Sequence, residues 1–500
     1  MRRATTIILT FLLLAMGLTG AALAWAGRSL TTSAATTTTA AATTITVPAA
    51  GAAGGLSLSG KLTQDKIVVG GDGTVSLSLT LSAAPEPVVP VLRDPPSAPQ
   101  RAVDMVLVLD RSGSMHGEKL RDAKAAILEL MAALTPNDRL GLVSYSEDVT
   151  WHTGLLPLTT ANRECLAAAV DAVMASGGTN LGAGLESGMT MLQQGRRGCV
   201  RCPHSSVPGN RVGRVLLISD GMANHGITDP AALGRLAARA VPGEFAVSTV
   251  GLGREFNEQT MTAIADCGQG TYHYLETPES FAEVFLKEFS ACRRVAAQGL
   301  EIRISLAGGL TLLDAAGYPV RTYGNEAVFQ PGDLLVGQSR SLFLTLRVPV
   351  DQAGPVHIEG IRARFRTDAG PAEANLAAPL LVTRVKNEAE AQASIDGQAW
   401  ERKVLQEDYN RLREAVAQDV KKGDKSAAKG RIERYRAEKQ ATNAQVGSAA
   451  VSRNLTSDLD ALGKEVDETF AAPAAKAEEA RQSKAKDLQY KAYGGRRDKN

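Results

Sequence analysis

The sequence of 500 residues predicts an α/β fold: a doubly wound, mostly parallel sheet inserted in a β-sandwich and followed by an α-helical region. Three observations favour this architecture. Over residues 102–291, apolar strand patterns alternate with amphipathic helix patterns, as in parallel sheets covered by helices on both faces. The flanking segments 56–97 and 298–385 show the period-two alternation of half-buried antiparallel strands. Residues 386–500 are rich in Ala, Glu, Lys, Arg and Gln, which mostly favour helices.

The first 26 residues have the pattern of a secretory signal peptide. A basic start, MRR, precedes the apolar run IILTFLLLAMGL, and the small residues of ALAWA allow cleavage after Ala24 or Ala26. An uncleaved membrane anchor is the alternative, because no further charge occurs before Arg28. Both interpretations predict an exported protein that is periplasmic, at the cell surface or secreted. Residues 27–55 form a Thr/Ala-rich linker without the large apolar side chains that a core needs.

The bulk composition is that of a soluble protein with several domains. An apolar fraction of 44% is enough for hydrophobic cores, and a formal charge of +2 gives no sign of a nucleic-acid partner. Aromatic residues make up 4%, which argues against a surface that stacks bases. We therefore expect no nucleic-acid partner, and membrane association only if the N-terminal segment is retained.

The α/β unit divides into strands and helices that mostly alternate along the chain. Its first strand, VLVL, is continuously apolar, which is typical of a strand buried on both faces. Asp229 is expected to cap a helix whose first residue is Pro230. Strands are expected at 104–110, 139–146, 214–220, 245–253 and 271–276, and helices at 117–134, 161–176, 180–194, 229–240, 257–267 and 278–289.

The two β-rich segments are expected to form one sandwich, since neither is large enough to close a core alone. The helical region after residue 385 permits two interpretations. Its modest apolar stripe favours a helical hairpin that packs on itself or on the sandwich, and the alternative is an extended coiled-coil arm. A break is expected at KKGDK, and the final GGRRDKN is expected to be a frayed basic tail.

Oxygen-bearing side chains gather where strands of the α/β unit end. Asp110, Ser112 and Ser114 follow the first strand in DRSGSM, and Asp220 ends a later strand. Thr179 lies in the glycine-rich SGGTNLGAG before a helix. The carboxyl ends of parallel strands meet at one sheet edge, so these side chains are expected to lie close together. Carboxylate and hydroxyl oxygens are the ligands that a hard divalent cation prefers.

These residues, in this order, resemble the metal-ion-dependent adhesion site of von Willebrand factor A (VWA) domains, which have a Rossmann-like α/β fold. The resemblance covers residues 102–291. It includes the M-x-G-x-K-L-x-x-A-K run from Met115 to Lys124 and the VGLG…IADCGQGTYHYLE pattern over residues 250–276. Exported bacterial members and the inter-α-trypsin-inhibitor heavy-chain type look most similar.

The resemblance implies a site for Mg²⁺ or Mn²⁺, with Ca²⁺ as a further candidate. Ser112 and Ser114 would ligate the ion directly. Thr179 would ligate it directly in one state and through water in another. Asp110 and Asp220 would act largely through bridging waters. Neutral hydroxyl ligands leave the ion electrophilic, so its open position would bind a Glu or Asp carboxylate of another protein, in adhesion or in envelope assembly.

The same residues also permit a metal-free interpretation. Asp110 would then cap the following helix, Ser112 and Ser114 would be turn residues, and the chain would be a structural scaffold of the cell envelope. His116 and His225 occur near the site but are expected to be exposed rim residues, because imidazole suits softer metals.

Cysteines offer no clear framework. The chain has Cys165, Cys199, Cys202, Cys267 and Cys292. Disulfides are plausible in an exported protein, and an odd count leaves at least one thiol unpaired within the chain. The C-x-x-C of Cys199 and Cys202 lies in a polar insertion and favours a local disulfide over a zinc or redox site. Cys267 and Cys292, near the ends of neighbouring helices, are the first choice for a second pair.

Motifs of catalysis are missing from the sequence. It contains no G-x-S-x-G, no H-E-x-x-H and no G-x-x-x-x-G-K-[ST] pattern. We therefore expect a binding protein and not an enzyme. Thiol–disulfide exchange at the C-x-x-C is the remaining enzymatic alternative.

Overall fold

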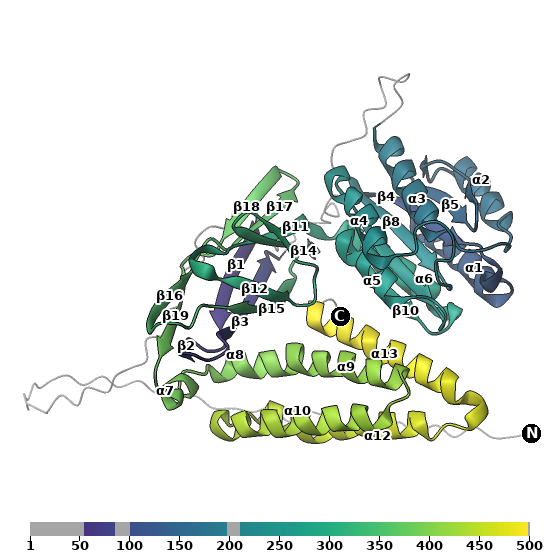
Figure 1. The fold of residues 1–500 in the computed structure, drawn as a ribbon. Helices are drawn as coiled ribbons and strands as arrows, with labels where there is room; N and C mark the ends of the chain where they lie inside the picture. The colour runs from purple at the N-terminus through teal and green to yellow at the C-terminus, as the bar shows by residue number, and fades with distance from the viewer. Residues whose placement is uncertain (1–54, 86–100, 198–210, 499–500) are drawn as a thin grey trace, which may run out of the picture. The chain divides into compact units, whose positions relative to one another are not determined.

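The computed structural model describes residues 55–85, 101–197 and 211–498 (Figure 1). The expected signal peptide and nearly all of the linker lie outside the described residues, as do Cys199 and Cys202. Residues 49–500 group into one compact unit, within which an α/β domain, a set of β-sheets and a helical region each have a core of their own.

The α/β domain has a central sheet in the order β10-β9-β8-β4-β5-β6, with the short β7 also paired to β5. Its core strands are parallel, and only β6 and β7 pair antiparallel with β5. The strands are β4 (Ala102–Asp110), β5 (Arg139–Tyr145), β6 (Val149–Trp151), β7 (Leu156–Pro157), β8 (Arg211–Ser219), β9 (Phe245–Leu252) and β10 (Gln269–Leu275). The helices are α1 (Glu118–Ala133), α2 (Thr160–Asp171), α3 (Leu181–Arg196), α4 (Pro230–Ala237), α5 (Glu258–Cys267) and α6 (Phe281–Arg293).

Helices cover both faces of this sheet (Figure 1). One face packs against α1, α2 and α6, and the other packs against α3, α4 and α5. Strand β4 lies in the middle, and its residues after Ala102 are all buried. The doubly wound, mostly parallel sheet is therefore confirmed, and the continuous apolar run of β4 follows from its two buried faces.

Local signals placed most helix ends correctly. The Asp229 side chain accepts a hydrogen bond from the backbone N–H of Ala232, and Pro230 is the first residue of α4, as predicted. Helix α2 ends before the predicted end at Ser176. The backbone N–H of Ser176 instead donates a hydrogen bond to the carbonyl of Arg111 at 2.7 Å. The chain around Ser176 is therefore held against the DRSGSM loop and is not part of the helix.

The two β-rich segments share a sheet, as the sandwich hypothesis requires. Strand β3 pairs with β15 antiparallel along its length, from Thr74↔Arg347 to Ser82↔Ser339. The sheets are β1-β3-β15-β12, β13-β14-β11-β17-β18 and β16-β19-β2, and one hydrophobic cluster joins them. Their strands are β1 (Leu56–Leu62), β2 (Lys66–Val68), β3 (Thr74–Ala83), β11 (Val295–Ser305), β12 (Thr311–Ala315), β13 (Arg321–Tyr323), β14 (Glu326–Leu335), β15 (Ser339–Arg347), β16 (Gly354–Ile358), β17 (Arg362–Thr367), β18 (Gly370–Asn375) and β19 (Leu380–Val385).

The C-terminal helices pack on one another around a shared core, which agrees with the hairpin interpretation and not with an extended arm. The predicted break is present, because Gly423 adopts φ 78° and Asp424 caps the next helix. The helices are α7 (Glu388–Gln392), α8 (Gly397–Arg402), α9 (Tyr409–Lys421), α10 (Lys425–Val446), α11 (Ala449–Arg453), α12 (Leu459–Phe470) and α13 (Ala477–Arg497). Across the described ranges, no helix has the length and apolarity needed to cross a membrane.

The prediction of a frayed basic tail is wrong. Helix α13 continues through Arg497, and both Arg496 and Arg497 are buried. Arg497 donates two hydrogen bonds to Asp266 of the α/β domain, at 2.7 and 3.1 Å. Arg496 pairs with Glu407 and with Asp314 at 3.0 Å. The ion pairs of Arg496 and Arg497 therefore anchor the end of α13. A run of basic residues in the sequence does not show whether such partners exist.

Close packing of α3 on β4 gives a testable stability effect. A Cβ added at Gly188 would overlap Cγ2 of the buried Val108. We expect Gly188→Ala to lower the free energy of unfolding by about 1–3 kcal/mol, because overpacking displaces the helix from the sheet. Urea unfolding followed by circular dichroism measures this. Gly463→Ala is the matched control on α12, where a Cβ meets nothing within 4 Å, and it should stabilise by about 0.5–1 kcal/mol. Equal effects of the two substitutions would contradict the packing argument.

Candidate metal centre

The five predicted site residues come from three segments at one edge of the α/β sheet. Asp110 ends β4, and Ser112 and Ser114 lie in the turn that follows it. Asp220 comes directly after β8, the parallel neighbour of β4. Thr179 precedes α3, and the next residue, Asn180, caps that helix. The parallel pairing of β4 and β8 is what brings the two aspartates to the same edge.

Asp110 is fixed by protein hydrogen bonds on both carboxylate oxygens. Its Oδ1 accepts from the backbone N–H of Ser112 at 2.8 Å, and its Oδ2 accepts from the Ser219 hydroxyl at 2.6 Å. The Tyr145 hydroxyl lies 3.5 Å from the same Oδ2. Complete burial raises the pKa of Asp110 to about 6, although the bonds from Ser219 and Ser112 act in the opposite direction. The nearby charge of Asp220 also contributes to this raised pKa.

Asp220 and the two serines form a continuous hydrogen-bonded chain. The Ser114 hydroxyl donates to Asp220 Oδ1 at 2.7 Å, so the Ser112 hydroxyl, 3.1 Å from Ser114 Oγ, is the donor of that pair. The second oxygen of Asp220, Oδ2, lies 2.5 Å from Lys119 Nζ. The Asp220 side chain is 0% exposed, and each of its oxygens accepts a hydrogen bond from one of these neighbours.

Thr179 is held by the loop that follows Asp220. Its backbone N–H donates to Asn224 Oδ1 at 2.7 Å, and its carbonyl accepts from the backbone N–H of Asn224 at 3.1 Å. A Cβ added at Gly221 would lie 3.4 Å from Ser114 Oγ and 3.5 Å from Thr179 Oγ1. The two hydroxyls therefore converge around Gly221, and a larger residue there would crowd them.

The donor set suits a hard divalent cation. Hydroxyl oxygens of Ser112, Ser114 and Thr179 face the same region as two aspartates, which is an all-oxygen set of the kind that Mg²⁺ prefers. In the part of the chain that the structure describes, no three His, Cys, Asp or Glu side chains converge as a metal site. An ion at this edge would therefore depend on the hydroxyl groups as well as on the carboxylates.

The structure places Tyr145, Ser219, Lys119 and Asn224 around the candidate site, and sequence reasoning assigned none of them a role there. Ser219 directly precedes Asp220, and Lys119 lies within the run that carries the family resemblance. The sequence therefore shows that Ser219 and Lys119 lie close to site residues along the chain, but it does not show that their side chains contact the two aspartates. The expected rim histidines are exposed, and His225 lies 3.7 Å from Glu147.

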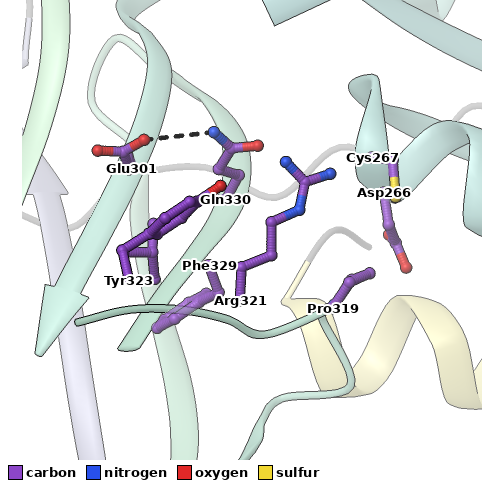
Figure 2. A pocket seen from close by; sticks show the side chains of 9 residues that line it. Asp266, Cys267, Glu301, Pro319, Arg321, Tyr323, Phe329 and Gln330 are labelled. Carbon is purple, nitrogen blue, oxygen red and sulfur yellow. Dashed lines mark hydrogen bonds between the residues drawn. The ribbon is translucent and has the colours of Figure 1, made fainter. Parts of the chain in front are cut away.

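The predicted Cys267–Cys292 disulfide is wrong, because both are free thiols in the structure. Cys292 is buried 3.4 Å from Arg214 Nε. Cys267 lies beside Asp266 at a small pocket of about 30 Å³, whose other walls include Arg321 (Figure 2). Nearness to helix ends did not indicate the direction of either side chain. Cys165 is also free and exposed.

Comparison with known proteins identifies the family of the α/β domain. The sequence model of the von Willebrand factor type A domain matches residues 104–287. The uncharacterized protein sll0103 of Synechocystis is 26% identical over 339 residues, covering 65% of this chain and 76% of that protein. The uncharacterized protein YfbK of Escherichia coli is 28% identical over 253 residues, covering 49% and 42%. The bovine inter-alpha-trypsin inhibitor heavy chain H3 is 30% identical over 164 residues, covering 33% and 18%. The chain thus spans less than half of YfbK and of the heavy chain.

Solved structures extend the likeness in fold beyond that domain. The von Willebrand factor type A protein from Catenulispora acidiphila superposes with a TM-score of 0.61 at 16% identity, covering 87% of this chain and 96% of that one. The ArnB paralog VWA2 from Sulfolobus acidocaldarius covers 87% of this chain with a TM-score of 0.50 at 14% identity. Residues 104–287 are therefore a von Willebrand factor type A domain, in a chain that continues into a helical C-terminal region.

Proposed function

We propose that this chain is an exported binding protein that captures a Glu or Asp carboxylate of another protein at a divalent-metal site on its VWA domain. The observation that carries the proposal is the convergence of Ser112, Ser114, Thr179, Asp110 and Asp220 from three segments at one sheet edge. Domains of this family generally mediate adhesion between proteins, and some of them use such a site. Adhesion and assembly of an envelope complex both fit this activity.

Each group of residues has a distinct part in the proposed binding. Bound Mg²⁺ or Mn²⁺, with Ca²⁺ as a further candidate, would supply an open coordination position for a partner carboxylate. The serine and threonine hydroxyls contribute neutral oxygens and so leave positive charge at the site. Asp110, held by Ser112 and Ser219, keeps a carboxylate fixed behind them. Asp220 orients the Ser114 hydroxyl by accepting its hydrogen bond.

Export belongs to the proposal and rests on the first 26 residues, whose pattern is that of a signal peptide. An uncleaved segment would anchor the chain to a membrane instead. The proposal contains no nucleic-acid partner and no enzymatic step. Thiol–disulfide exchange would depend on Cys199 and Cys202, which lie outside the described residues.

A metal-free scaffold is the second candidate function, and the Lys119–Asp220 ion pair favours it. The ammonium group compensates the buried Asp220 charge without any ion. A scaffold would keep its partner after loss of either aspartate, whereas the metal-dependent protein would not.

Titration of Mn²⁺ into the purified full-length chain tests the metal site. We expect one saturable site, and a loss of affinity of about 100-fold or more in Asp220→Asn and in Ser112→Ala, because each removes an oxygen donor or its charge. Electron paramagnetic resonance of free Mn²⁺ gives the dissociation constants. Asp229→Asn is the matched control, since asparagine also caps a helix and Asp229 caps α4.

The carboxylate part of the proposal is tested with two peptides that differ by one residue. A peptide with a single Glu should bind the Mn²⁺-loaded chain more tightly than its Gln counterpart, and chelation with EDTA should abolish the difference. Binding that ignores both the metal and the Glu would favour the scaffold.

A further inference from the structure

Lys119 is a cation aimed at the candidate metal centre. Its Nζ lies 2.5 Å from Asp220 Oδ2, and its side chain is 33% exposed while Asp220 is fully buried. Among the described residues, Lys119 is the one cation that forms an ion pair with Asp110 or Asp220, and its partner is Asp220. Arg111 lies in the same loop but donates to Ser176, and His225 faces Glu147.

The position of Lys119 on its helix is electrostatically unfavourable by itself. It is the second residue of α1, whose N-terminus carries the positive end of the helix dipole. Gly117, the N-cap residue of α1, adopts φ 87° and has no side chain that could cap the helix and offset the positive end of the dipole. Glu118, the first residue of α1, offsets part of the helix dipole, and the contact with Asp220 compensates the lysine charge itself and holds the side chain at the site.

A divalent ion at this centre would compete with Lys119 for the same carboxylate. Without the ion, two carboxylates and one ammonium group leave a net charge of −1 if all are ionised, and the Ser112–Ser114–Asp220 chain is closed by Lys119. With the ion, two cations share this small space and repel each other. The partly exposed lysine is the group that can move toward solvent.

We propose that Lys119 is a built-in competitor of the divalent ion and sets the metal affinity of the site. This inference rests on the proposed function. The lysine keeps the buried Asp220 compensated before the ion arrives, and it lowers affinity for the ion. A lysine that stays near the loaded site adds positive charge, which favours a carboxylate as the group that binds there.

Mn²⁺ titration of Lys119→Gln in the full-length chain tests the inference. We expect the dissociation constant to fall by about 10-fold or more, because the competing charge is gone. The second readout is thermal unfolding: in EDTA, Lys119→Gln should unfold at a lower temperature than the parent, and saturating Mn²⁺ should remove that deficit. Lys124→Gln is the matched control on α1, since Lys124 donates to the Asp171 carbonyl and not to the site.

The outcomes separate this inference from the proposed function. Tighter Mn²⁺ binding by Lys119→Gln, with Lys124→Gln unchanged, supports the inference, even where the parent binds too weakly to measure. Equal or weaker binding by Lys119→Gln, while the parent binds and Asp220→Asn does not, overturns the inference and leaves the metal site standing. Failure of the parent and of Lys119→Gln to bind Mn²⁺ overturns both.

Discussion

Replacing the buried Asp104 with alanine is expected to lower the free energy of unfolding by about 3–5 kcal/mol, because it leaves partly buried arginines without their counter-charge. Asp104 lies in β4 and is 0% exposed. Arg139 donates to both of its oxygens at 2.7 Å, and Arg211 donates to Oδ1 at 2.7 Å. A third arginine, Arg196, has its Nε 3.9 Å from Oδ2. Burial alone raises the pKa of Asp104, but the bonds from Arg139 and Arg211 outweigh it and lower the pKa.

Urea unfolding at neutral pH measures this effect. The matched control is Glu186→Ala, which removes a single ion pair of 3.1 Å to Arg239. Both side chains of that pair are well exposed, so the cost should stay below about 1 kcal/mol. Asp104→Asn tests the charge separately from the side-chain volume, and it should be nearly as damaging as the alanine. Similar costs for Asp104→Ala and Glu186→Ala would mean that solvent compensates the arginines.

The Asp104 cluster illustrates which contacts sequence reasoning misses. Its arginines come from β5, α3 and β8, so they converge only once the sheet has formed. No local spacing connects them, and each reads as an ordinary surface charge in the sequence. The same holds for Lys119 and Asp220, and for Arg497 and Asp266, which are far apart along the chain.

What the sequence predicted well depends on local chemistry or on periodicity. The continuous apolar run of β4 indicates a strand buried on both faces, and Asp229 with Pro230 fixes the start of α4. The candidate site was also predictable, because parallel topology places the ends of β4 and β8 side by side. The position of the Thr179 loop was less predictable, because it depends on hydrogen bonds to Asn224 from another segment.

Glu288 is expected to make the stability of the VWA domain fall in acid. It lies on α6, where Ser248 donates to Oε2 at 2.7 Å and His273 Nε2 lies 2.7 Å from Oε1. Arg214 approaches the carboxylate at 3.5 Å and also faces Asp333 and Cys292. Burial alone raises the pKa of Glu288, but the His273 bond and the Arg214 charge lower it from 4.5 to about 2.

A carboxyl whose pKa is lower in the folded state stabilises the fold at pH values above its unfolded pKa. The contribution of Glu288 is therefore complete above pH 4.5 and is lost as the pH falls toward about 2. This lowering of the Glu288 pKa corresponds to about 3 kcal/mol of stability, of which roughly 1 kcal/mol is left at pH 3. Stability falls with pH in this window because the unfolded chain takes up the proton first.

Unfolding of Glu288→Gln by urea at pH 7, 5, 4 and 3 measures the contribution. We expect the variant to be less stable than the parent by about 3 kcal/mol at pH 7, and this difference should shrink by about 2 kcal/mol by pH 3. Glu283→Gln is the control on the same helix, where the side chain is exposed, and it should change stability by less than about 0.5 kcal/mol at each pH. A difference between Glu288→Gln and the parent that stays constant with pH would show that Glu288 is held by packing and not by its charge. The histidine and arginine partners would then be structural neighbours without an electrostatic role in folding.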